Sequence, residues 1–158
     1  MKCEVICIVK KEKSIFDNII EKYSSRVKMQ MDFSIKKIKS GFKGKKSLSI
    51  NEQKKIEAKL IENSISNSDY IVLLDENGFN YDSEEFSEFL NKRLISGIKK
   101  LVFIIGGPYG FEEKILKKHK NHIALSKMTF PHQMIRLFLI EQIYRSCSIL
   151  NNTKYHHK

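Results

Sequence analysis

The C-terminal segment TKYHHK (153–158) combines side chains that could carry chemistry. Tyr155, His156 and His157 supply a phenol and two imidazoles at consecutive positions. Such groups can stack on a nucleobase and move a proton near neutral pH. The alternative is a frayed, solvated chain end, and the segment taken alone favours that interpretation.

Two apolar runs end in residues suited to a ligand site. KLVFII (100–105) is followed by GGPYG (106–110), and YIVLLD (70–75) ends at Asp75 beside a turn. Ligands of parallel α/β sheets bind beyond the carboxyl ends of strands, where glycine lets the backbone approach closely. We therefore expect Leu74 and Gly106 to be two walls of any site at this edge. A plain Gly-Pro turn and a solvated Asp75 explain the same residues equally well, and no Gly-Lys-Ser/Thr follows to indicate a phosphate loop.

The segment LSKMTFPHQM (125–134) mixes loop residues with apolar Leu125, Met128 and Phe130. Pro131 suits the first turn of a helix and pushes Phe130 toward an extended conformation. The segment therefore predicts the start of a helix, and its apolar side chains leave open a second role as a binding surface.

Neither a metal site nor a nucleophilic triad is indicated by the other reactive residues. His119 and His122 are close in sequence, but no Cys or carboxylate supplies regular ligand spacing around them. Cys3 and Cys7 lie in an apolar run and are expected to be inert core residues. We predict no metal.

Composition indicates one domain, residues 1–158, with a polyanionic partner. The chain carries 29 Lys and Arg against 18 Asp and Glu, a formal net charge of +11. This excess favours nucleic acid, although a lysine-rich surface that is merely solvated remains the alternative. Three scattered cysteines suit a reducing cytoplasm. There is neither a signal peptide nor an apolar run long enough to span a membrane, so we expect a soluble cytoplasmic protein.

The elements that must position these segments alternate between strand and helix. Predicted strands cover CEVICIVK (3–10), MDFSIKKI (31–38), 70–75, 100–105 and a short stretch near HIALS (122–126). Predicted helices cover 14–27 (on Ile15, Ile19 and Tyr23, with Phe16 and Ile20 beside them), 52–65 (on Ile56, Leu60 and Ile61), 82–96 (with an Asp82–Glu85 capping box), 111–119 and 131–150. A basic loop, 39–47, separates the second strand from the second helix. This order predicts an α/β domain with a mainly parallel sheet flanked by helices.

Taken in order, IGGPYGF, LSKMTFPHQMIRLFLIEQIYR and a terminal YH resemble the RlmH family (YbeA-like proteins) over essentially the whole chain. These are bacterial pseudouridine N3-methyltransferases of large-subunit (23S) ribosomal RNA, within the SPOUT superfamily. The resemblance implies a SPOUT fold with a C-terminal deep trefoil knot, a homodimer pairing through the last helix, and S-adenosylmethionine held bent in the knot. The cofactor-binding positions it implies are Leu74, Gly106, Gly107, Leu125, Ser126, Lys127, Met128, Thr129 and Phe130.

The same resemblance implies roles for the tail. His156 is the candidate proton acceptor, Tyr155 stacks on or positions the base, and Arg145 neutralises a phosphate or the charge developing on the base. The expected function is N3 methylation of a pseudouridine on the assembled ribosome. The alternatives are a non-catalytic ribosome-binding or assembly factor and a methyltransferase for transfer RNA. Two departures from the family, Tyr109 in the glycine loop and His157 after the YH pair, leave the substrate contacts there open.

Overall fold

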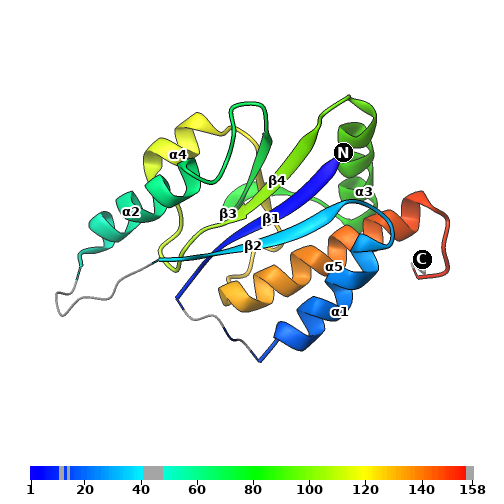
Figure 1. Cartoon of the computed structure of the whole chain (residues 1–158), viewed down its shortest axis with the longest axis horizontal. Helices are drawn as coiled ribbons and strands as arrows, with labels where there is room; N and C mark the ends of the chain where they lie inside the picture. Colours follow the sequence, from blue (N-terminus) through cyan, green and yellow to red (C-terminus); the bar gives the residue numbers. More distant parts are fainter. Residues whose placement is uncertain (11–12, 14, 41–47, 156–158) are drawn as a thin grey trace.

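The computed structural model describes residues 1–10, 13, 15–40 and 48–155, and over these residues five strands form one wholly parallel sheet (Figure 1). The strand order is β2-β1-β4-β3-β5. The strands are β1 (Lys2–Val9), β2 (Phe33–Lys39), β3 (Tyr70–Asn80), β4 (Lys100–Ile105) and β5 (His122–Ala124). The helices are α1 (Asp17–Lys28), α2 (Ile50–Glu62), α3 (Ser83–Ile95), α4 (Glu113–Lys118) and α5 (His132–Leu150). The predicted α/β class is therefore confirmed.

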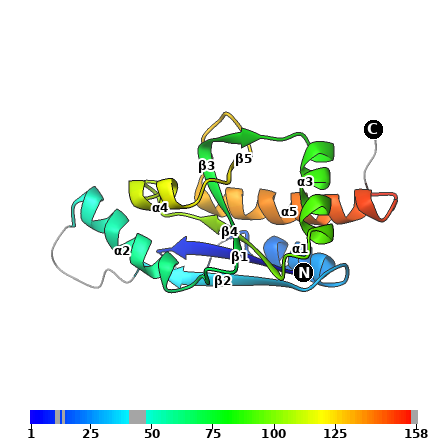
Figure 2. The same cartoon turned by 90° about the horizontal axis from the view of Figure 1, so that it is seen from above.

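The sheet is covered on both faces because its central strands are apolar at every position. Alternate residues of β4 point to opposite sides: Phe103 packs under α3 and α5, whereas Ile104 packs under α2 and α4. Helices α1, α3 and α5 form one layer, and α2 and α4 form the other (Figures 1 and 2). Strand β2, whose sequence alternates, lies at the sheet edge with its outer residues exposed, as predicted.

Helix starts follow the predicted capping chemistry. The Asp82 side chain accepts from the Glu85 backbone N–H at 2.8 Å, and the Glu85 carboxylate accepts from the Asp82 backbone N–H at 2.9 Å. A second capping box, which was not predicted, joins Ser49 and Glu52 at the start of α2. Each box satisfies backbone donors that the first helical turn leaves unpaired.

Two helix faces were predicted only in part. Ile15, which precedes α1, and Ile19 are exposed, whereas the neighbouring Ile20 is buried together with Ser24 and Val27. In α2, Ile61 is buried as predicted, but Ile56 is exposed, and the helix also buries Gln53, Glu57 and Ala58. In each case the pattern placed the apolar stripe too far around the helix, because an apolar residue beside the true stripe was counted as part of it.

Strand β3 was predicted to end at Asp75, but it continues to Asn80. Leu74 pairs with Ile123, and after a register shift Phe79 pairs with Ile123 and Asn80 with Ala124. Residues 75–78 form the irregularity between the two pairings, and the Asp75 carboxylate accepts from the Asn77 backbone N–H at 2.8 Å. The apparent turn at Asn77-Gly78 is thus a bulge within the strand, and Gly78 is required because a Cβ there would meet the Ile123 nitrogen at 2.5 Å.

Helix α5 is the central helix of its layer and packs against both α1 and α3 (Figure 1). It begins after Pro131, as predicted, and buries Leu139, Ile140 and Ile143 in the core. Within the described part of the chain, no helix is both long enough and apolar enough to span a membrane. Most of the predicted basic loop, residues 41–47, lies outside the described residues.

Candidate functional site

The carboxyl ends of β3, β4 and β5 meet at one edge of the sheet. Leu74 is in register with Ile105 on one side and with Ile123 on the other. Gly106 follows Ile105 directly, so the two expected walls, Leu74 and Gly106, lie on neighbouring strands. Three adjacent parallel strand ends form the usual position of a ligand site in such sheets.

A cavity of about 350 Å³ opens at this edge, within the size range of small-molecule sites. We call it the strand-end cavity. Eight of the nine residues predicted to bind a cofactor line it: Leu74, Gly106, Gly107, Leu125, Ser126, Met128, Thr129 and Phe130. The ninth, Lys127, is not among the lining residues. Ile135 of α5 and the acidic residues Asp75 and Glu76 are also among the lining residues, so the lining is mainly apolar with two acidic side chains.

The segment 125–130 is ordered by local contacts. The Ser126 hydroxyl accepts from the Met128 backbone N–H at 2.9 Å, which closes a turn. The Phe130 ring packs edge-on against Phe138 of α5, with 5.4 Å between ring centroids. The Met128 side chain is 73% exposed although it lines the cavity, so it forms part of the rim.

His132, at the start of α5, also lines the strand-end cavity and was not singled out from the sequence. The Nδ1 atom of its ring is buried and has no hydrogen-bond partner among the described residues. Burial lowers the pKa of His132, and the nearby cations Arg136 and Lys10 lower it further. His132 is therefore neutral near pH 7. The sequence could have pointed to His132, because in the TFPH motif this residue directly follows Pro131, where the helix was predicted to start.

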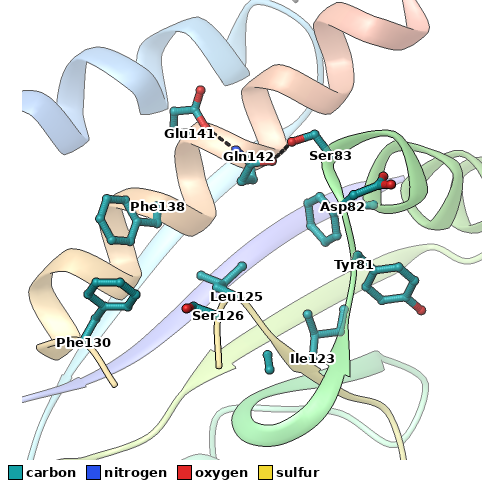
Figure 3. Close-up of a pocket in the computed structure, with 12 residues that line it drawn as sticks. Tyr81, Asp82, Ser83, Ile123, Leu125, Ser126, Phe130, Phe138, Glu141 and Gln142 are labelled. Atoms are coloured by element: carbon teal, nitrogen blue, oxygen red, sulfur yellow. Dashed lines mark hydrogen bonds between the residues drawn. The ribbon is translucent and has the colours of Figure 1, made fainter. Parts of the chain in front are cut away.

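A second cavity, of about 480 Å³, lies beside the first (Figure 3). It shares Ile123, Ala124, Leu125, Ser126 and Phe130 with the strand-end cavity. Its far side is polar, because the Ser83 hydroxyl donates to Gln142 at 2.9 Å and the Gln142 amide donates to Glu141 at 2.7 Å (Figure 3). The segment 123–126 is thus the partition between the two cavities.

The structure places Tyr155 and Arg145 together, but away from the strand-end cavity. Tyr155 donates to Glu141 Oε1 at 3.0 Å, and Arg145 Nη2 contacts the same oxygen at 2.7 Å. The Arg145 guanidinium also lies over the Tyr155 ring, 4.9 Å from its centroid. Neither residue lines the strand-end cavity, whereas Glu141 lines the second one. Tyr155 is therefore packed, and the predicted frayed tail is wrong at this position; His156 and His157 lie outside the described residues.

The electrostatics of this group favour a protonated phenol and a paired guanidinium. Burial raises the pKa of Tyr155, and its hydrogen bonds with Tyr23 and Glu141 raise it further. The hydrogen bond to Glu141 raises the pKa of Arg145. Tyr155 can therefore donate a hydrogen bond but is not poised as a base, and the charge of Arg145 is already balanced by Glu141.

Two further predictions concern the remaining reactive residues. Cys3 and Cys7 are buried in β1, and burial raises the pKa of the Cys7 thiol to about 12, so both are inert core residues as expected. Among the described residues, no group of His, Cys, Asp and Glu side chains is arranged to hold a metal ion.

Comparison with known proteins places the whole chain in one family. Residues 1–156 match the family model described as "Predicted SPOUT methyltransferase". A protein of Christiangramia forsetii named "Ribosomal RNA large subunit methyltransferase H" is 46% identical, and relatives of the same name from Flavobacterium johnsoniae and Parabacteroides distasonis are each 45% identical. Each alignment covers 100% of this chain and 100% of the relative.

A solved structure supports the same fold. The crystal structure of tRNA (m1G37) methyltransferase from Aquifex aeolicus superposes with a TM-score of 0.54 over 92% of this chain and 70% of that chain. At 13% sequence identity, this likeness concerns the fold alone.

Proposed function

The chain belongs to the SPOUT methyltransferase family, and on that basis we propose that it methylates N3 of a pseudouridine in large-subunit (23S) ribosomal RNA on the assembled ribosome, with S-adenosylmethionine as the methyl donor. In this reaction a nitrogen–carbon bond forms, the sulfonium–methyl bond breaks, the N3 proton leaves and S-adenosylhomocysteine is released. The observation that carries the proposal is that eight of the nine positions expected to bind the donor line one cavity. A ribosomal substrate implies a cytoplasmic enzyme.

The strand-end cavity fits the donor in size and chemistry. Leu74, Phe130 and Ile135 offer an apolar slot for an adenine ring, and the backbone of residues 125–130 offers hydrogen-bonding groups. Asp75 and Glu76 line the cavity, and their negative charge favours a cationic sulfonium or ammonium group. The bound donor supplies an electrophilic methyl group, so the protein must mainly position the acceptor nitrogen in line with it.

The tail residues are proposed to act on the acceptor. The imide N–H of pseudouridine is weakly acidic, and a positioned base speeds its removal. We assign that role to His156, with Tyr155 orienting the tail through its bond to Glu141 and Arg145 favouring negative charge on the base or binding a phosphate. Because Tyr155 and Arg145 do not line the cavity of their own chain, the arrangement favours action at a partner subunit's cavity.

A homodimer is part of the proposal. Helix α5 is apolar on several faces, and Met134, Leu137, Phe138, Tyr144 and Leu150 are only partly buried in the single chain. A helix that is apolar beyond one stripe indicates a further packing partner. The resemblance further implies that α5 passes through the loops at the strand ends as a deep trefoil knot, and the double pairing of β3 with β5 around residues 75–78 is compatible with that path.

Transfer of labelled methyl groups to ribosomes that lack the modification tests this function. We expect label on 23S ribosomal RNA of intact ribosomes, and much less on separated subunits or free RNA. Digestion to nucleosides should place the label on N3 of pseudouridine. Label that appears only on transfer RNA would overturn the substrate, and failure to bind S-adenosylmethionine in calorimetry would support a non-catalytic ribosome-binding factor.

A further inference from the structure

Helix α2 buries two polar side chains where a core helix usually presents apolar ones. Gln53 and Glu57, one turn apart, are 8% and 3% exposed, and the Gln53 amide donates to Glu57 Oε1 at 2.9 Å. Burying a carboxyl group costs free energy unless hydrogen bonds or a paired charge offset the loss of water, so such a group is rare in a helix core. Glu57 lines neither cavity, so any functional role must act through a neighbour.

That neighbour is Gly107, in the wall of the strand-end cavity. A Cβ added to Gly107 would lie 2.2 Å from Glu57 Oε2, 2.5 Å from Oε1 and 2.6 Å from Cδ, so its three nearest atoms all belong to this carboxyl group. The backbone itself does not demand glycine there, because the glycines with positive φ in the described chain are Gly97 and Gly110. A side chain at position 107 would have to displace the Glu57 carboxyl group, which is buried and bonded to Gln53.

Gly106 and Gly107, which we call the glycine wall, have neighbours in both helical layers of the fold. On the α2 side Glu57 packs on Gly107, and on the α5 side His132 lies near the Gly106 backbone. Helices α2 and α5 lie on opposite faces of the sheet (Figure 2). The two consecutive glycines at the end of β4 thus lie between side chains from two separate helices.

We propose that Glu57 is a positioning residue, whose carboxyl group packs on Gly107 and holds the glycine wall in the shape that binds the methyl donor. This inference rests on the proposed function, because it assigns the strand-end cavity to the donor. Lys10 and Lys54 are the charged groups that face Glu57, and its hydrogen-bond partner is Gln53. Glu57 makes no contact with the donor and shapes its site through the backbone.

A double-mutant cycle between Glu57 and Gly107 tests the contact. Gly107→Ala forces a Cβ against the carboxyl group, and we expect donor affinity to fall between about 10- and 100-fold. Glu57→Ala removes the packing group, and we expect a loss of about 10-fold. Because no carboxyl group remains to collide, the double variant should bind the donor no more weakly than Glu57→Ala alone.

Further variants separate positioning from a loss of folding. Glu57→Gln keeps the shape and the bond to Gln53, so donor affinity should stay within about 3-fold of the unsubstituted protein. Glu113→Gln makes the same chemical change at an exposed position on α4 and should alter nothing. For Glu57→Ala, the KM for the donor should rise while kcat at saturating donor stays within about 2-fold, whereas partial unfolding would lower kcat.

The inference would be overturned if Glu57→Ala left donor affinity unchanged. It would also be overturned if Gly107→Ala lowered donor affinity by the same factor in the unsubstituted protein and in the Glu57→Ala variant. If the unsubstituted protein itself binds no S-adenosylmethionine, the proposed function fails, and the contact is then tested by the free energies of unfolding of the same four proteins. Additive values would refute the contact, and non-additive values would support it. Should Glu57→Ala not fold, Glu57→Asp, which withdraws the carboxyl group by one methylene, takes its place in the cycle.

Discussion

The Tyr155 hydroxyl and the Glu141 carboxylate are joined by a hydrogen bond of 3.0 Å, which ties the chain end back onto the middle of α5. The Tyr155 ring also packs edge-on against Tyr144, with 4.7 Å between ring centroids. Tyr155, the last described residue, is therefore a packed part of the fold.

Replacing Tyr155 by Phe should slow methyl transfer without weakening donor binding. The change removes the bond to Glu141 but keeps the ring, so the tail loses orientation; we expect a drop in kcat of about 10-fold. Single-turnover methyl transfer and calorimetry measure the two quantities. Lys154→Gln, an exposed neighbour, is the control. A Tyr155→Phe protein that transfers methyl at the full rate would remove the hydroxyl from the mechanism.

His156→Ala should lower the methyl-transfer rate more severely. A general base typically contributes 100-fold or more, so we expect a loss of about 100-fold with normal donor affinity. The pH dependence of the rate supplies a second readout, because the variant should lose the rise in activity that accompanies deprotonation of an imidazole. An unaltered pH profile in the variant would assign the proton to another group.

Met128→Ala should weaken donor binding with little effect on stability. The side chain lines the strand-end cavity but is 73% exposed, so only contacts with a ligand are lost. Burial of its methylene groups predicts a loss of about 10-fold in affinity. Met29→Ala, at a side chain that is 83% exposed at the end of α1, is the matched control. Equal affinity in both variants would show that the rim does not contact the donor.

Glu57→Gln should become more stable, relative to the unsubstituted protein, as pH rises. Burial raises the pKa of Glu57 above its ordinary 4.5, although the bond from Gln53 and the charges of Lys10 and Lys54 oppose the shift. Between the unfolded and the folded pKa, the unfolded state has lost a proton that the folded state retains, so stability falls with rising pH. Glutamine does not ionise, so the variant escapes this loss. Urea unfolding from pH 4 to pH 8 measures the free energy of unfolding of both proteins, and a difference between them that does not change with pH would contradict the prediction.

The three cysteines should react slowly in the folded protein. All are buried, and burial raises the pKa of Cys7 to about 12 and of Cys147 to about 11, so little thiolate forms near neutral pH. Labelling with a thiol reagent should approach completion only in denaturant, where three thiols become available. Rapid stoichiometric labelling of the native protein would show that a buried strand or helix opens readily.

The strands and their alternation with helices were largely predictable, because burial on both faces leaves a strong pattern. Continuous apolar runs placed β1 and β4 to within one or two residues of their observed bounds. The extension of β3 past Asp75 was not predictable, since Asn77-Gly78 has the local chemistry of a turn. Only the second pairing, of Phe79 and Asn80 with β5, makes it part of a strand.

The donor-site residues came from the family resemblance, whereas spacing alone indicated only that Leu74 and Gly106 could form walls. Glu57 could not be found from either. It lies at helical spacing from Gln53 and Ile61, but a polar residue on a predicted helix is ordinarily assigned to solvent. Its burial depends on packing against Gly107, which is 50 positions away in sequence and is brought close only by the tertiary fold.

The central place of α5 between α1 and α3 has a consequence for how the protein is made. The layer that covers one face of the sheet lacks its middle helix until residues 132–150 have been synthesised. Contacts between the first and last helices join residues far apart in sequence, and such contacts form late and slowly. We therefore expect the nascent chain to stay incompletely folded until α5 has been synthesised, with Phe103 and its neighbours in β4 exposed to chaperones in the interval.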